Sequence, residues 1–104
     1  MRPRLAFAMA ADKTRYVFDD ELLDRLGRSC DILSRTPMED FTSPASRALL
    51  RDADILVTGW GCPVVSRDVL AEAPRLRLIA HAAGTVKYTL DPAVYEAGIT
   101  VTNA

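Results

Sequence analysis

Two glycine-bearing stretches hold the residues that could bind a small anion. Gly59 and Gly61 lie in the stretch GWGCPVV, and Gly84 lies in HAAGTVKY. Glycine lets the backbone approach a ligand closely, and N–H groups exposed there can hold a carboxylate. The same pattern is also typical of ordinary tight turns, so the pattern by itself leaves both interpretations open. Trp60, between two of these glycines, would either form part of a contact surface or pack over a helix end.

Two side chains within these stretches have reactive groups. His81, the only histidine, could donate a proton or line a pocket, but it has no carboxylate partner nearby in the sequence. We therefore expect it to be a strand-end residue that is hydrogen-bonded to the backbone. Cys62 could be a nucleophile, but the sequence shows no evident base to activate it. Lys87 and Tyr88 could reach an anionic ligand or form a solvated pair on a loop.

Several common site types are excluded by the motifs. The sequence contains neither GxGxxG after its first apolar run nor GxxxxGK[ST], so it has no evident cradle for a nucleotide phosphate. One histidine and two separated cysteines, Cys30 and Cys62, do not make a plausible zinc site or a disulfide framework. A receiver domain would need paired carboxylates after the first strand, where Asp12 stands alone.

Size and composition indicate one globular domain. The chain has 104 residues, of which 49% are hydrophobic, and its net charge of -1 gives no reason to expect nucleic acid or an anionic membrane as a partner. No apolar run approaches the length of about 20 residues that a membrane-spanning helix needs. The start of the sequence resembles a signal peptide, but its apolar run, Leu5–Ala11, fits a buried strand better. We expect a cytoplasmic protein.

Apolar runs alternate with helical patterns along the whole chain. The expected strands are residues 5–9, 31–34, 54–59, 76–82 and 99–101, and the expected helices lie in residues 18–30, 43–53, 66–73 and 91–98. Such alternation predicts βαβ units and one parallel sheet with helices on both faces. We predict an α/β fold, a flavodoxin-like doubly wound sheet with strand order 2-1-3-4-5. Ligands bind such sheets beyond the carboxyl ends of the strands, where both glycine-bearing stretches would lie.

Residues 50–104 resemble the first domain of the D-isomer-specific 2-hydroxyacid dehydrogenases, the family that includes phosphoglycerate dehydrogenase. The similar stretches are ADILVTG, VLAEAPRLRLIAHAAGTV and EAGITVTNA. The first half of the chain resembles the family only in the order of its elements. The family commonly has a glycine pair followed by Asp and Asn, where this chain has Gly84, Thr85, Val86, Lys87 and Tyr88. This difference leaves the substrate identity open.

The resemblance implies an enzyme that transfers a hydride between NAD or NADP and a small 2-hydroxy or 2-keto acid. Residues 1–104 would be its substrate-side domain. Backbone N–H groups would hold the substrate carboxylate, and a second loop would flank the same cleft. The residues implied are Ala83, Gly84, Thr85 and Val86 for the carboxylate, and Gly59, Trp60 and Gly61 for the flanking loop.

The resemblance also implies that the catalytic arginine, histidine and glutamate and the cofactor site belong to a second, Rossmann domain. We expect that domain after residue 104, so this chain alone would be an inactive fragment, and the full-length enzyme would be a homodimer. Two alternatives remain at the level of sequence. One is a free-standing flavodoxin-like module that binds a small anion or a protein. The other is a domain of an unrelated α/β enzyme.

Overall fold

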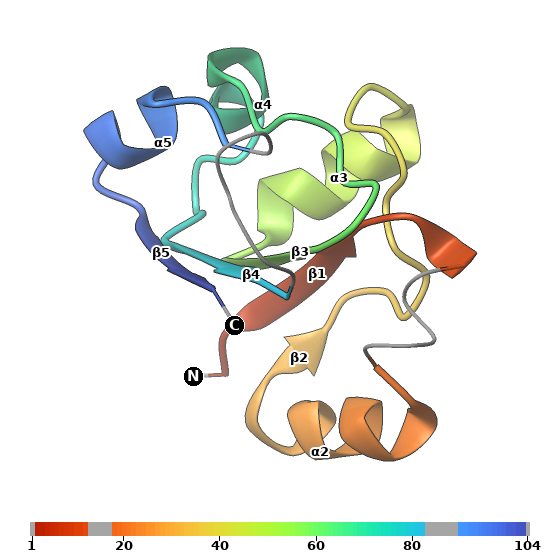
Figure 1. The fold of residues 1–104 in the computed structure, drawn as a ribbon. Helices are drawn as coiled ribbons and strands as arrows, with labels where there is room; N and C mark the ends of the chain where they lie inside the picture. Colours follow the sequence, from red (N-terminus) through yellow and green to blue (C-terminus); the bar gives the residue numbers. More distant parts are fainter. Residues whose placement is uncertain (1, 13–17, 83–89, 104) are drawn as a thin grey trace.

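A parallel sheet of five strands forms the centre of the protein (Figure 1). The computed structural model describes residues 2–12, 18–82 and 90–103. The strand order is β2-β1-β3-β4-β5, which confirms the doubly wound, flavodoxin-like fold predicted from the sequence. The elements are β1 (Arg4–Ala8), α2 (Asp20–Ser29), β2 (Asp31–Ile32), α3 (Pro44–Asp52), β3 (Ile55–Thr58), α4 (Arg67–Ala71), β4 (Leu78–His81), α5 (Ala93–Glu96) and β5 (Thr100–Asn103).

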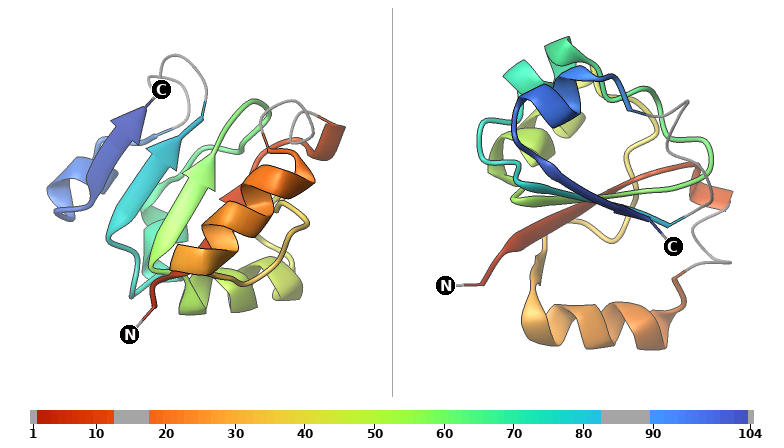
Figure 2. Two further views of the ribbon diagram at one scale, coloured as in Figure 1. Left: turned by 90° about the horizontal axis from the view of Figure 1, so that it is seen from below. Right: turned by 60° about the vertical axis from the view of Figure 1, so that its left-hand side comes forward.

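Helices cover both faces of this sheet, as the sequence predicts, but they do so unequally. α2 lies on one face, whereas α3, α4 and α5 lie on the other (Figures 1 and 2). The strand order explains this division. The chain moves outward from β1 to β2 and then runs back across the sheet to β3, β4 and β5. Because parallel crossovers are right-handed, a reversal of direction moves the connecting helix to the opposite face.

Two apolar clusters form the core, one on each face of the sheet. Leu5 and Phe7 of β1 point into the cluster beneath α2, whereas Ala6 and Ala8 point into the cluster beneath α3, α4 and α5. All four side chains are buried. A strand that is covered on both faces needs apolar residues at consecutive positions. This explains why the first strand has a continuous apolar run in the sequence instead of an alternating one.

Part of the sheet remains uncovered on the α2 side. Leu56 and Ile79 point to the face with three helices and are fully buried, at 0% exposure. Their neighbours Ile55 and Leu78 point to the α2 side and are only half-buried. We call this surface the open face; it consists of Ile55, Leu78, Ala80 and Thr102 on β3, β4 and β5.

The helix boundaries follow local signals in the sequence. Ser43 accepts a hydrogen bond from the Ser46 N–H at 3.2 Å at the start of α3, and Ser66 caps α4 in the same way. Both caps were predicted. Gly98 follows α5 with a φ of +78°, which confirms the predicted left-handed stop. The strand expected at residues 31–34 is shorter than predicted, because β2 comprises two residues at the edge of the sheet.

Asp54 connects three strands at the amino-terminal edge of the sheet. Its carboxylate accepts a hydrogen bond from the Arg4 N–H at 2.9 Å and lies 3.6 Å from the Arg75 guanidinium. Its backbone carbonyl accepts a hydrogen bond from the Arg77 N–H at 3.0 Å. The hydrogen bond from Arg4, followed by the charges of Arg75 and Arg77, holds the pKa of Asp54 below its ordinary value. This residue supports the fold at the edge opposite to the candidate site.

Candidate functional site

The candidate site lies at the carboxyl edge of the sheet, where neighbouring strands end side by side. Ala8 of β1 is paired with Thr58 of β3, Thr58 with His81 of β4, and His81 with Asn103 of β5. Residues that follow these positions therefore emerge at one edge. This is the location at which open parallel sheets bind ligands.

The loop after β3 is tightly packed against the residues that follow β1. The Ala10 N–H donates a hydrogen bond to the Trp60 carbonyl at 2.8 Å, and the Cys62 N–H donates to the Gly59 carbonyl at 3.1 Å. Gly61 has a φ of +79°, and a Cβ added there would lie 2.6 Å from the Ala10 Cβ. A Cβ at Gly59 would lie 3.2 Å from the Met9 sulfur. Turn geometry and close packing therefore account for both glycines.

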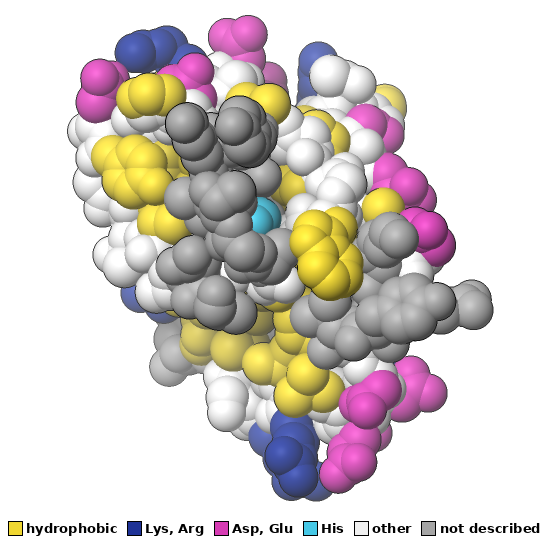
Figure 3. Space-filling model, viewed as in Figure 1, with side chains coloured by type: hydrophobic (Ala, Val, Ile, Leu, Met, Phe, Trp, Pro, Cys, Tyr) yellow, Lys and Arg dark blue, Asp and Glu magenta, His cyan; other side chains and the backbone are white. Residues whose placement is uncertain are grey.

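Trp60 is a large apolar side chain at this edge, and it is 55% exposed. Its backbone is fixed by the hydrogen bond from Ala10, so the indole stands on an anchored loop. Val64 and Tyr95 are similarly exposed. The space-filling view shows hydrophobic side chains on the same side of the molecule (Figure 3). Of the two sequence-based interpretations, the exposure of Trp60 favours a contact surface over packing on a helix end.

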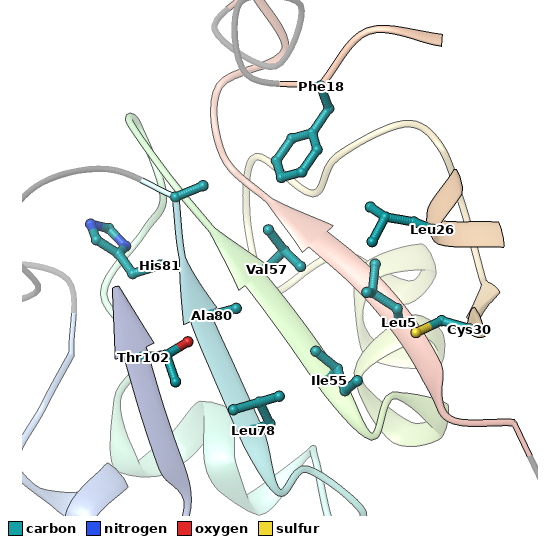
Figure 4. Close-up of a pocket in the computed structure, with 11 residues that line it drawn as sticks. Leu5, Phe18, Leu26, Cys30, Ile55, Val57, Leu78, Ala80, His81 and Thr102 are labelled. Atoms are coloured by element: carbon teal, nitrogen blue, oxygen red, sulfur yellow. The ribbon is translucent and has the colours of Figure 1, made fainter. Parts of the chain in front are cut away.

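His81 is buried, with 4% exposure, and its side chain interacts with a neighbouring strand. Its Nδ1 lies 2.8 Å from the Thr58 hydroxyl, within hydrogen-bonding distance, and Thr58 is itself fully buried. Either group can donate, depending on the imidazole tautomer. The sequence suggested a backbone partner for His81; the Thr58 hydroxyl is a side-chain partner that the sequence analysis did not identify. Figure 4 shows the imidazole turned away from the apolar side chains of the open face.

Cys62 is not activated as a nucleophile. Burial raises the pKa of its thiol to about 12, and the nearby Gly59 backbone lowers it only in part. The Sγ atom lies 3.2 Å from the Pro63 carbonyl, to which the thiol donates. At neutral pH the thiol is therefore protonated and hydrogen-bonded, which agrees with the absence of an evident base in the sequence.

The residues predicted to bind the carboxylate belong to the segment that follows β4. Ala83, Gly84, Thr85 and Val86, with Lys87 and Tyr88, lie outside the described residues. The described part of the chain contains no group of three or more His, Cys, Asp or Glu side chains that could hold a metal ion. Within the same ranges, no helix combines the length and the apolar character that crossing a membrane requires.

An apolar groove of about 470 Å³ runs along the α2 side of the sheet to this edge (Figure 4). The sequence analysis did not identify it. Phe18, Leu26 and Cys30 form one side, and the open face forms the floor. His81 and Ala82 lie at its end near the carboxyl edge. The groove has apolar walls and few polar groups, so it resembles an incompletely covered core more than a site for an anion.

Comparisons with known proteins support the fold. No family model matches the chain, and no curated protein matches it. Among solved structures, the chain is similar to a phosphoglycerate oxidoreductase from Rhizobium etli, with a TM-score of 0.72 and 20% sequence identity. The match covers 98% of this chain and 30% of that one, so this chain spans about a third of its structural neighbour. At this identity, the likeness shows a shared fold.

Proposed function

We propose that this chain is the substrate-side domain of an oxidoreductase that uses NAD or NADP to interconvert small 2-hydroxy and 2-keto acids. The observation that carries the proposal is the fold match, which includes nearly the whole chain but less than a third of a protein described as a phosphoglycerate oxidoreductase. The resemblance of residues 50–104 to the 2-hydroxyacid dehydrogenases supports it independently. In the whole enzyme, a second domain and a homodimeric assembly belong to the same proposal.

The chemistry assigned to this chain is binding and orientation. Ala83, Gly84, Thr85 and Val86 follow β4 and would present backbone N–H groups to the substrate carboxylate. Gly59, Trp60 and Gly61 follow the adjacent strand β3 and would form the neighbouring wall. The hydrogen bond from Ala10 to Trp60 anchors that wall, so the indole could shield a bound acid from water without a large rearrangement. Because this loop is already ordered, binding would lose little conformational entropy there.

The described residues do not fit a dinucleotide cofactor. The segment after β1, where a glycine-rich turn would be needed, begins with Met9 and Ala10, and the Cβ and backbone of Ala10 pack against Gly61. The nicotinamide cofactor, which supplies or accepts the hydride, would therefore be held by the second domain. Proton transfer is also assigned to that domain. In this chain the His81 ring is buried beside Thr58, and the Cys62 thiol has a pKa of about 12.

The binding role can be tested on the 104-residue chain by two-dimensional NMR. Titration with D-lactate and with pyruvate should shift the amide resonances of residues 59–62 and 82–86. The methyl ester of lactate, which lacks the carboxylate, should not shift them. Trp60→Ala should weaken binding while leaving the fold intact, because this indole is exposed. If both acids leave the two loops unchanged, or if the ester acts as well as the acids, the proposed carboxylate site is wrong.

A further inference from the structure

Trp60 stands on a loop whose backbone is fixed on both sides of it. Its carbonyl accepts a hydrogen bond from the Ala10 N–H at 2.8 Å. Gly59 and Gly61, its two neighbours, pack so closely against the residues after β1 that an added Cβ would lie 3.2 Å and 2.6 Å from the nearest atoms. Because this backbone is fixed, a shift of the loop does not bury the indole, which is 55% exposed.

Val64 is a second exposed apolar side chain on the same loop. The next residue, Val65, is fully buried and pairs with Leu90 in an isolated parallel bridge. Its carbonyl accepts a hydrogen bond from the Asp91 N–H at 3.1 Å. Consecutive side chains of an extended backbone point to opposite sides, so the burial of Val65 turns Val64 outward, where it is 53% exposed. The loop is therefore anchored at both ends and presents two apolar side chains to solvent.

The described charges near this loop do not favour a second anionic group on a ligand. No charged residue lies between Gly59 and Ser66. The described segments that follow the strands at this edge are residues 9–12, 33–43, 59–66 and 82. Among them Arg35 is the one basic residue, and its guanidinium lies 2.7 Å from the Asp24 carboxylate, so its charge is already paired. The acidic residues of these segments, which would repel a phosphate, are Asp12, Glu39 and Asp40.

We infer that Trp60 selects the substrate by contact with its side chain, so that the preferred acid is a 2-hydroxy or 2-keto acid with an apolar, aromatic substituent. This inference rests on the proposed function, in which residues after β4 hold the carboxylate. Thr58 of β3 is paired with His81 of β4, and neighbouring strands lie about 4.8 Å apart. The substituent of an acid held beside β4 therefore has the Trp60 loop within reach, and this loop offers apolar contact and no charge.

The size of the indole sets the expected preference. Ligand sites gain most from apolar and aromatic side chains, and two aromatic rings in contact gain more than their buried area alone provides. The phenyl ring of D-phenyllactate can cover much of the exposed indole, whereas the methyl group of D-lactate can cover little of it. We therefore expect D-phenyllactate to bind at least about tenfold more tightly than D-lactate. D-3-phosphoglycerate, whose substituent is charged, should bind more weakly than D-phenyllactate.

Trp60 is the only tryptophan of the chain, so its fluorescence reports on this contact without a label. Titration with D-phenyllactate should change this fluorescence. The change should saturate with the same dissociation constant as the amide shifts of residues 59–62 measured by NMR. D-lactate should need a concentration at least about tenfold higher to saturate the amide shifts. If D-phenyllactate leaves the fluorescence of Trp60 unchanged, the inference is overturned.

Three variants, each titrated with both acids by NMR, test the role of the indole itself. Trp60→Ala should bring the two affinities within about twofold of each other, whereas Trp60→Phe, which keeps an aromatic ring, should retain most of the preference. Tyr95→Ala is the matched control, because Tyr95 is 54% exposed on α5, and it should keep the wild-type preference. All three changes replace exposed side chains, so circular dichroism should show an unchanged fold.

The outcomes separate this inference from the proposed function on which it rests. Equal affinities for D-phenyllactate and D-lactate would overturn the inference and leave the carboxylate site in place. Tightest binding of D-3-phosphoglycerate, or loss of the preference in Tyr95→Ala as in Trp60→Ala, would overturn it in the same way. If neither acid shifts residues 59–62 or 82–86, the proposed carboxylate site is wrong, and the inference fails with it.

Discussion

Gly61 gives the sharpest test of the packing at the candidate site, because a matched control exists in the same chain. Gly61 and Gly98 have almost the same positive φ, +79° and +78°. A Cβ at Gly61 would lie 2.6 Å from the Ala10 Cβ and 3.1 Å from the Ala10 nitrogen, whereas a Cβ at Gly98 would meet nothing within 4 Å. Alanine at either position is strained by the positive φ, but only Gly61→Ala also forces two loops apart.

The two costs can be separated in magnitude. The left-handed conformation costs an alanine about 1–2 kcal/mol, and this applies to both variants. Overpacking against Ala10 adds about 1–3 kcal/mol to Gly61→Ala alone. Moving the loop would also weaken the hydrogen bond from the Ala10 N–H to the Trp60 carbonyl, which contributes on the order of 1 kcal/mol. The free energy of unfolding of Gly61→Ala should therefore fall roughly 1–4 kcal/mol below that of Gly98→Ala.

Urea unfolding of the two single variants measures this difference directly. The double variant Ala10→Gly, Gly61→Ala removes the close contact between Cβ atoms, so it should recover part of the excess cost but not the conformational strain. If Gly61→Ala and Gly98→Ala are equally destabilised, the two loops do not pack as closely as described. The structural explanation of the glycine at this position would then fail.

Three further predictions concern other parts of the chain. Gly27→Ala should raise the free energy of unfolding by about 0.5–1 kcal/mol in urea melts, because Gly27 lies within α2 and a Cβ there meets nothing within 4 Å; a destabilised variant would contradict the packing of this helix. The lowered pKa of Asp54 stabilises the folded state above the ordinary carboxyl pKa of about 4, and that stability is lost as the pH falls through the folded pKa. Asp54→Asn should therefore have a lower free energy of unfolding than the wild type at pH 7, and this free energy should fall less on acidification. If the free energy of unfolding falls equally with pH in both proteins, the prediction is refuted. Cys62, with its pKa of about 12, should react with iodoacetamide at pH 8 at least about a hundredfold more slowly in the folded than in the unfolded chain, as mapped by mass spectrometry; comparable rates would show that the thiol is not buried.

The fold could be predicted because its determinants are local or follow from general rules. Continuous apolar runs indicated buried strands, and Ser43, Ser66 and Gly98 indicated helix ends at the correct positions. Strand alternation and right-handed crossovers then left few topologies to consider. The length of β2 was overestimated because Leu33 continues the apolar run of the sequence, whereas the strand ends at Ile32.

The contacts at the candidate site could not be predicted because they join residues that are far apart in the sequence. The Thr58–His81 hydrogen bond spans 23 positions and depends on strand register. A signal did exist: both residues end adjacent predicted strands, and aligning those ends would have placed them side by side. The contact between Ala10 and Gly61 depends on how closely two loops approach, which the sequence pattern does not specify. To predict the open face, one would also need to know where every helix packs on the sheet.

The central claim is that this chain contributes the substrate-side domain of a 2-hydroxyacid dehydrogenase. The most direct measurement is the intact mass of the native polypeptide, captured from its source with an antibody raised against this chain and assayed for NADH- or NADPH-dependent reduction of 2-keto acids. The account predicts a polypeptide roughly three times the 11.4 kDa of this chain, with reductase activity that the 104-residue chain alone lacks. A native polypeptide of 11.4 kDa, or a longer one that reduces no 2-keto acid, would contradict the account.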